Sequence, residues 1–169
     1  MSHHFLPLAA SLMVRDTSRR RYRPATDDQI LEAARQVVDR RMQRGMSFGS
    51  PADVKEYLLT KLAGLEHEVF AVLFLDTKHR LIEYTEMFHG TIDAADVHPR
   101  EVIKVALRLN AAAAIVGHNH PSGDPSPSDA DRSLTYQLKE ALRLVDVRLL
   151  DHIVVGGRFT VSFAESGML

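Results

Sequence analysis

The most informative segment of this 169-residue chain is Gly117-His118-Asn119-His120-Pro121-Ser122-Gly123-Asp124-Pro125-Ser126-Pro127-Ser128-Asp129-Ala130-Asp131. It follows a short apolar run, residues 113–117, that predicts a buried strand, and it precedes a helical pattern of apolar residues. The ends of strands that face the starts of helices are where α/β proteins place their functional sites. The segment therefore predicts a strand-to-helix junction that carries a functional site.

Three side chains of this segment have the spacing of a metal site. In an extended chain residues i and i+2 project to the same side, so His118 and His120 can offer two nitrogens to one ion. The loop that follows is rich in proline and glycine and can fold back to bring Asp131 toward them. Two neutral imidazoles and one carboxylate leave a fourth position open, which is the pattern of a catalytic zinc site. We predict a mononuclear zinc site with these three ligands.

The predicted start of the following helix adds to this pattern. Ser126 can serve as its N-cap, with Pro127 in the first turn and Asp129 placed to complete a capping box. Ser128 and Asp131 lie three residues apart, so they share a face of the helix. A pair of histidines separated by one residue is by itself a weak signal. The added serine and aspartate at fixed spacing make the metal interpretation far more specific.

Outside this segment the sequence alternates between helical and strand patterns. Helices are predicted from Thr26 or Asp27 to Gly45, from Pro51 to Leu62, from Pro99 to about Leu109 and from Ser126 onward, and strands at 69–75, 81–88, 113–117, 149–155 and 159–161. This order predicts a mixed β-sheet with helices packed on it, in an α/β or α+β layer architecture.

Residues 1–47 differ in character from the rest, and we predict that they form an N-terminal arm and helix ahead of a domain at 48–169. The arm contains a short apolar stretch and five arginines, Arg15, Arg19, Arg20, Arg21 and Arg23. Short runs of charge are commonly solvated, so we interpret the cluster as a connector. Binding of nucleic acid or another polyanion is the alternative.

The composition excludes several classes of protein. A net charge of -1, from 21 basic and 22 acidic residues, argues against strong non-specific binding of nucleic acid, although a local basic patch is compatible with it. Because the chain has no cysteine, any metal site must use histidines and carboxylates. No apolar run approaches 18 residues, so no membrane span is predicted. The apolar stretch Phe5 to Val14 lacks the preceding basic residues of a signal peptide, so we expect a cytoplasmic protein.

The spacing of the two histidines, Ser128 and Asp131 resembles the JAMM motif of the JAB/MPN metallopeptidases, and residues 118–123 resemble the signature of the bacterial RadC proteins. Other segments that resemble RadC proteins are Phe70 to Asp76, Phe88 to Thr91, Val97 to Glu101 and Leu150 to His152. The resemblance covers about residues 48–169 and implies a JAB/MPN fold, which is related to that of cytidine deaminases. RadC proteins often carry a helix-hairpin-helix region ahead of this domain. No such paired motif precedes residue 48, which weakens a role in DNA repair.

The resemblance also implies the catalytic residues and the substrate class. The family has a glutamate ahead of its first core strand, and Glu68 matches that position. Glu66 is the alternative, and strand alternation cannot separate the two because they lie two residues apart. Glu68 would take the proton of the attacking water and pass it to the leaving amine, and Ser128 would donate a hydrogen bond to the oxyanion. The implied substrate is an amide or isopeptide bond in a protein or peptide. Candidates to orient the histidines are Asp124, Asp151 and His152.

Several other functions were weighed against this one. The adjacent letters of His118-Asn119-His120 do not match HNH nucleases, whose residues are spread over a ββα unit. Zinc deaminases need a cysteine pair, and the barrel of amidohydrolases needs a longer chain. Two classes stay open: an accessory protein in DNA repair or recombination whose zinc site is structural or vestigial, and a non-catalytic module that binds a protein partner.

Overall fold

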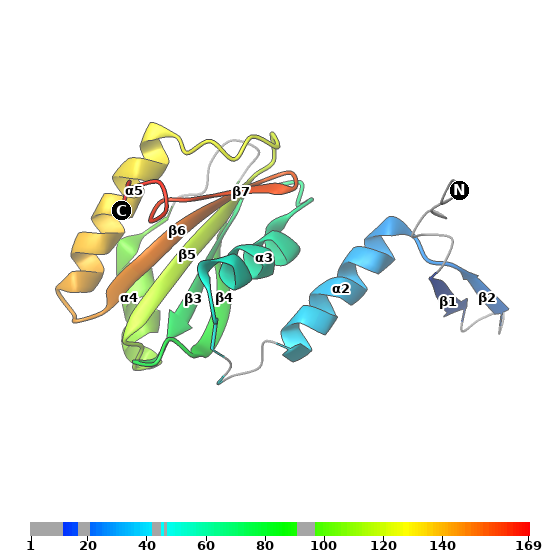
Figure 1. The fold of residues 1–169 in the computed structure, drawn as a ribbon, viewed down its shortest axis with the longest axis horizontal. Coiled ribbons are helices and arrows are strands. Elements are labelled where there is room, and N and C mark those ends of the chain that lie inside the picture. Colours follow the sequence, from blue (N-terminus) through cyan, green and yellow to red (C-terminus); the bar gives the residue numbers. More distant parts are fainter. Residues whose placement is uncertain (1–11, 17–20, 42–44, 46, 91–96) are drawn as a thin grey trace. The chain divides into compact units, whose positions relative to one another are not determined.

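The computed structural model describes residues 12–16, 21–41, 45, 47–90 and 97–169 (Figure 1). The chain divides into two compact units, Met1–Arg41 and Met42–Leu169. Within the described ranges, no helix is long and apolar enough to cross a membrane.

The first unit contains a small hairpin followed by a helix. Its elements are β1 (Met13–Asp16), β2 (Arg21–Pro24) and α2 (Asp27–Arg41). β1 and β2 pair antiparallel, so the described part of the arginine cluster lies in a hairpin that the sequence analysis did not predict. Each strand has only four residues and no apolar alternation, so the sequence pattern gave no strand signal. α2 begins as predicted, with Thr26 and Gln29 capping each other, and it is described as far as Arg41; its predicted end at Gly45 follows residues 42–44, which lie outside the described ranges.

The second unit contains a five-stranded sheet and three helices. Its elements are α3 (Pro51–Leu62), β3 (Val69–Leu75), β4 (Leu81–His89), α4 (Pro99–Arg108), β5 (Ala113–His120), α5 (Asp129–Arg143), β6 (Arg148–Gly156) and β7 (Phe159–Ser162). The strand order is β4-β3-β5-β6-β7, in which β5 and β6 are parallel and every other neighbouring pair is antiparallel. The predicted mixed sheet with flanking helices is therefore confirmed.

Helices cover both faces of this sheet (Figure 1). On one face, Val102 of α4 and Leu138 of α5 pack with Phe70 and Val116 in the main hydrophobic core. On the other face, α3 lies so close that a Cβ on Gly117 would come within 2.8 Å of Leu58. Since side chains alternate along a strand, the even-numbered residues of β5 point to the α4 and α5 face. His118 and His120 therefore share that face, and Asn119 points to the opposite one.

The strand-to-helix junction differs from the prediction at both ends. β5 continues through His120, three residues beyond the predicted end at Gly117, because it pairs with β6 along its full length. α5 begins at Asp129 with Ser128 as its N-cap, so the predicted cap at Ser126 is wrong. Proline disfavours helical geometry in the residue before it, and Pro127 therefore keeps Ser126 out of the helix.

Candidate metal centre

Three side chains converge where β5 ends and α5 begins. Nε2 of His118 lies 2.9 Å from Nε2 of His120 and 3.2 Å from Oδ1 of Asp131, and Nε2 of His120 lies 3.5 Å from Oδ2 of Asp131. His118 and Asp131 are buried, and His120 is partly exposed. The three residues form a group that could hold a metal ion. The structure thus brings together the three ligands predicted from the sequence.

A capping box at the start of α5 fixes the position of Asp131. Its backbone N–H donates to Oγ of Ser128 at 3.1 Å, and its Oδ2 accepts from the backbone N–H of Ser128 at 2.7 Å and from the Ser128 hydroxyl at 2.6 Å. These contacts occupy Oδ2 and leave Oδ1 facing His118. The cap therefore fixes a ligand carboxylate as well as the helix end. The hydroxyl proton of Ser128, predicted to stabilise an oxyanion, is directed at Asp131 in this arrangement.

The proline-rich loop determines which nitrogen His120 presents to the site. Nδ1 of His120 lies 2.8 Å from the backbone carbonyl oxygen of Asp124. A carbonyl can only accept, so Nδ1 carries the proton and Nε2 presents its lone pair to the site. The predicted role of Asp124 in orienting a histidine thus belongs to its backbone, because its side chain accepts from Ser126 N–H at 2.9 Å. Gly156 holds this loop close, since a Cβ there would lie 2.3 Å from Pro125 N.

A chain of hydrogen bonds determines the tautomer of His118. Its Nδ1 lies 2.8 Å from Nε2 of His152, whose Nδ1 lies 2.6 Å from Oγ1 of Thr135. The Thr135 hydroxyl donates to the backbone carbonyl of Asp131 at 2.6 Å, so it must accept from His152. His152 therefore accepts from Nδ1–H of His118, and Nε2 of His118 also presents a lone pair. Burial, and secondarily the charge of His118, lowers the pKa of His152 well below its usual value, which keeps the ring neutral.

When both imidazoles are neutral, the two histidines consequently face each other with unprotonated nitrogens. Two lone pairs 2.9 Å apart repel unless a proton or a metal ion lies between them. Burial alone would raise the pKa of Asp131, but the hydrogen bonds that His118 and His120 donate to it when their rings are protonated outweigh burial and hold that pKa far below its usual value. The hydrogen bond with Asp131 raises the pKa of His120, because the carboxylate stabilises a positive charge there. The group could therefore hold a cation.

Glu68 lies next to this group, immediately before β3. Glu68 lies two residues before Phe70, so strand alternation gives the two side chains the same face. Phe70 pairs with His118 on the neighbouring strand and stacks on its ring. The hydrogen bond with Asp131 is the largest cause that raises the pKa of His120, and the negative charge of Glu68 is a small further one. Glu68 is half-buried, whereas Glu66 is exposed. The choice of Glu68 over Glu66 as the base stays a prediction.

Asn119 has a role that the sequence analysis overlooked. Its Oδ1 accepts from the N–H of Val69 at 2.8 Å, and its Nδ2 donates to the carbonyl of His67 at 3.0 Å. The amide thereby clamps the backbone on both sides of Glu68. In the sequence Asn119 simply separates the two histidines. Strand parity could have shown that it faces away from the metal group, although it could not show which segment it would meet there.

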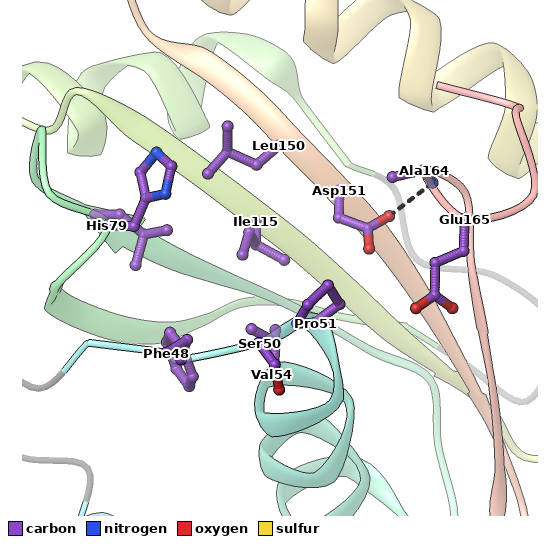
Figure 2. A pocket seen from close by; sticks show the side chains of 12 residues that line it. Phe48, Ser50, Pro51, Val54, His79, Ile115, Leu150, Asp151, Ala164 and Glu165 are labelled. Carbon is purple, nitrogen blue, oxygen red and sulfur yellow. Dashed lines mark hydrogen bonds between the residues drawn. The ribbon is translucent and has the colours of Figure 1, made fainter.

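Asp151 lies on the opposite face of the sheet from its neighbour His152, so only His152 of the two reaches a candidate ligand. The Asp151 carboxylate accepts from Ser162 Oγ at 2.6 Å and from the N–H of Ala164 at 3.0 Å. Figure 2 shows it lining a mainly apolar cavity of about 300 Å³ at the start of α3. The residues around this cavity include Phe48, Val54, Ile115 and Leu150. Asp151 thus stabilises the chain around β7.

Comparison with known proteins identifies the domain. The family model of the RadC-like JAB domain matches residues 48–168. A UPF0758 protein of Vibrio cholerae is 59% identical over 145 residues, which cover 86% of this chain and 91% of the relative. A UPF0758 protein of Methylibium petroleiphilum is 58% identical over 140 residues, covering 83% of this chain and 63% of the relative. A UPF0758 protein of Xylella fastidiosa is 55% identical over 139 residues, covering 82% and 62%. This chain therefore spans just under two thirds of the length of the latter two.

Proposed function

This chain belongs to the RadC-like JAB domain family, and on that premise we propose that it is a zinc-dependent hydrolase of amide or isopeptide bonds in proteins or peptides. One observation carries the proposal. The hydrogen bonds to Nδ1 of both His118 and His120 leave two Nε2 lone pairs and the Asp131 carboxylate facing one another. Three such protein ligands leave a coordination position for water or substrate, as catalytic zinc sites do.

The donor set and its dimensions favour zinc. Two imidazoles and a carboxylate, without any thiolate, suit this ion. Donors bound at about 2.0–2.1 Å to a tetrahedral zinc lie about 3.3 Å from each other. Nε2 of His118 lies 2.9 Å from Nε2 of His120 and 3.2 Å from Oδ1 of Asp131, which is close to that value. When bound, zinc would polarise the substrate carbonyl and make water easier to deprotonate.

The residues around the ligands would then complete the reaction. Glu68 takes a proton from the attacking water as its oxygen bonds to the carbonyl carbon. The Ser128 hydroxyl turns from Asp131 to donate to the oxygen that gains negative charge. When the carbon–nitrogen bond breaks, Glu68 delivers its proton to the leaving amine. The products are a carboxylic acid and an amine, and Glu68 is again ionised.

Metal content and hydrolysis can be tested separately. We expect about one zinc per chain in purified protein, measured by elemental analysis. His118→Ala and Asp131→Asn should lose the zinc, the asparagine being chosen because it keeps an acceptor for the helix cap. Glu68→Gln should keep the zinc and lose cleavage of peptide and isopeptide-linked libraries, and Glu66→Gln is the matched control that keeps both. Full activity of the Glu68→Gln protein would exclude Glu68 as the base, and zinc retention without any turnover would favour a binding module.

A further inference from the structure

The hairpin β1–β2 concentrates positive charge in an otherwise acidic chain. Residues 12–24 contain five arginines and one aspartate, a net charge of +4. Since the whole chain carries -1, the remaining residues carry -5. The balanced composition therefore conceals a separation of charge. All five basic residues are arginines, whose planar guanidinium groups bind phosphate in a two-pronged geometry that lysine cannot match.

The pairing of the two strands places arginines on both faces of this hairpin. Arg15 is opposite Tyr22, so these two side chains share one face. Arg21 and Arg23 are two residues apart in β2, so they share the other face. All four side chains are exposed, Tyr22 at 67%. The described part of the hairpin is thus a narrow ribbon with cationic groups on both sides.

The hairpin has little to stabilise it from within. Every residue of β2 is exposed, and in β1 Met13 and Arg15 are exposed and Val14 is half-buried. The chain closes its base through a hydrogen bond from Ala25 N–H to the carbonyl of Leu12 at 2.8 Å. Isolated two-stranded hairpins are marginally stable in water. An anionic partner that forms ion pairs with the arginines would stabilise such a hairpin.

We propose that the β1–β2 hairpin binds duplex DNA by entering a groove, with Arg15, Arg21 and Arg23 contacting phosphates. The major groove of B-DNA admits a two-stranded ribbon, and phosphates line both walls of that groove. Tyr22 adds a hydroxyl that can bond to the sugar-phosphate backbone. An anionic membrane surface would meet only one face of the ribbon and would leave the other face's arginines unpaired. This inference is independent of the proposed hydrolase reaction.

The proposal is tested by fluorescence anisotropy of a labelled duplex of about 20 base pairs with the full chain, in about 50 to 200 mM NaCl. The triple variant R15A/R21A/R23A should bind at least 10-fold more weakly. Its plot of log affinity against log salt concentration should be shallower by about 3, because three phosphate contacts are lost. A matched control is R100A/R108A/R143A, which removes the same charge from three exposed arginines near glutamates in the second unit. The control should bind nearly as tightly as the unmodified chain.

Two further measurements keep the result interpretable if the alanine variant loses the hairpin itself. R15K/R21K/R23K keeps the charge, so it should retain the salt dependence while binding several-fold more weakly. Glu68→Gln should bind DNA like the unmodified chain. The proposal is overturned if the unmodified chain does not bind at low salt or if the control triple loses as much affinity as the hairpin triple. Tighter binding to single-stranded DNA or to phosphatidylserine vesicles than to the duplex would also overturn it.

Discussion

Replacing Asn119 by alanine would test how this protein positions Glu68. The substitution removes the acceptor of the Val69 N–H and the donor to the His67 carbonyl, at 2.8 and 3.0 Å. Val69 is 1% exposed, so water cannot replace the lost acceptor, whereas His67 lies at an exposed position. A buried donor left without a partner costs about 1–3 kcal/mol. We therefore expect Asn119→Ala to lower the free energy of unfolding by about 2 kcal/mol.

Urea unfolding of the variant, followed by circular dichroism, measures this loss. Gln137→Ala, an exposed amide truncated on α5, is the control and should change stability by less than about 0.5 kcal/mol. Because the three candidate ligands keep their own hydrogen bonds, Asn119→Ala should retain its metal affinity and lose hydrolysis. Asn119→Asp keeps an acceptor for Val69 but sets a carboxylate oxygen against the His67 carbonyl, so it should be no more stable than the alanine variant at neutral pH. A fully stable and active Asn119→Ala protein would refute the clamp.

Three other predictions concern the metal group. Gly156→Ala should destabilise the protein by about 1–3 kcal/mol and weaken metal binding, because the new Cβ would lie 2.3 Å from loop backbone; calorimetric metal titration and thermal unfolding measure both. Thr135→Val should weaken metal affinity about 10–100-fold by leaving His152 without its acceptor, while Thr135→Ser should restore it. The hydrogen bond with Asp131 raises the pKa of His120, so metal affinity should fall by up to about tenfold per pH unit below that raised pKa; competition with a chromophoric chelator across pH would show no such fall if the interpretation is wrong.

The candidate ligands were predictable because their signal is local. His118 and His120 project together from any extended strand, and the strand is indicated by the apolar run before them. The helix that carries Asp131 was likewise evident from its apolar stripe, although its start was placed too early. The short hairpin β1–β2 escaped prediction because its strands of four residues have no apolar alternation to recognise.

The supporting residues were not predictable at the same level. Nothing in the sequence distinguishes Thr135 from other helical residues. Its role depends on the packing of α5 beside β6, which brings its hydroxyl to His152. Asn119 gains its role only when β3 pairs with β5, which brings residues 50 positions apart within hydrogen-bonding distance. Such contacts depend on strand order and helix packing, and these could not be predicted from the sequence alone.

The sequence by itself determined which side chains can bind a metal ion, since their chemistry and spacing follow from residue type and from the two-residue repeat of a strand. It also determined the mixed sheet with helices, through apolar periodicity. Only the tertiary structure decided which nitrogen each histidine presents, because a tautomer is fixed by the partner of the other ring nitrogen. Those partners come from a loop and from a parallel strand, and folding alone brings them to the site.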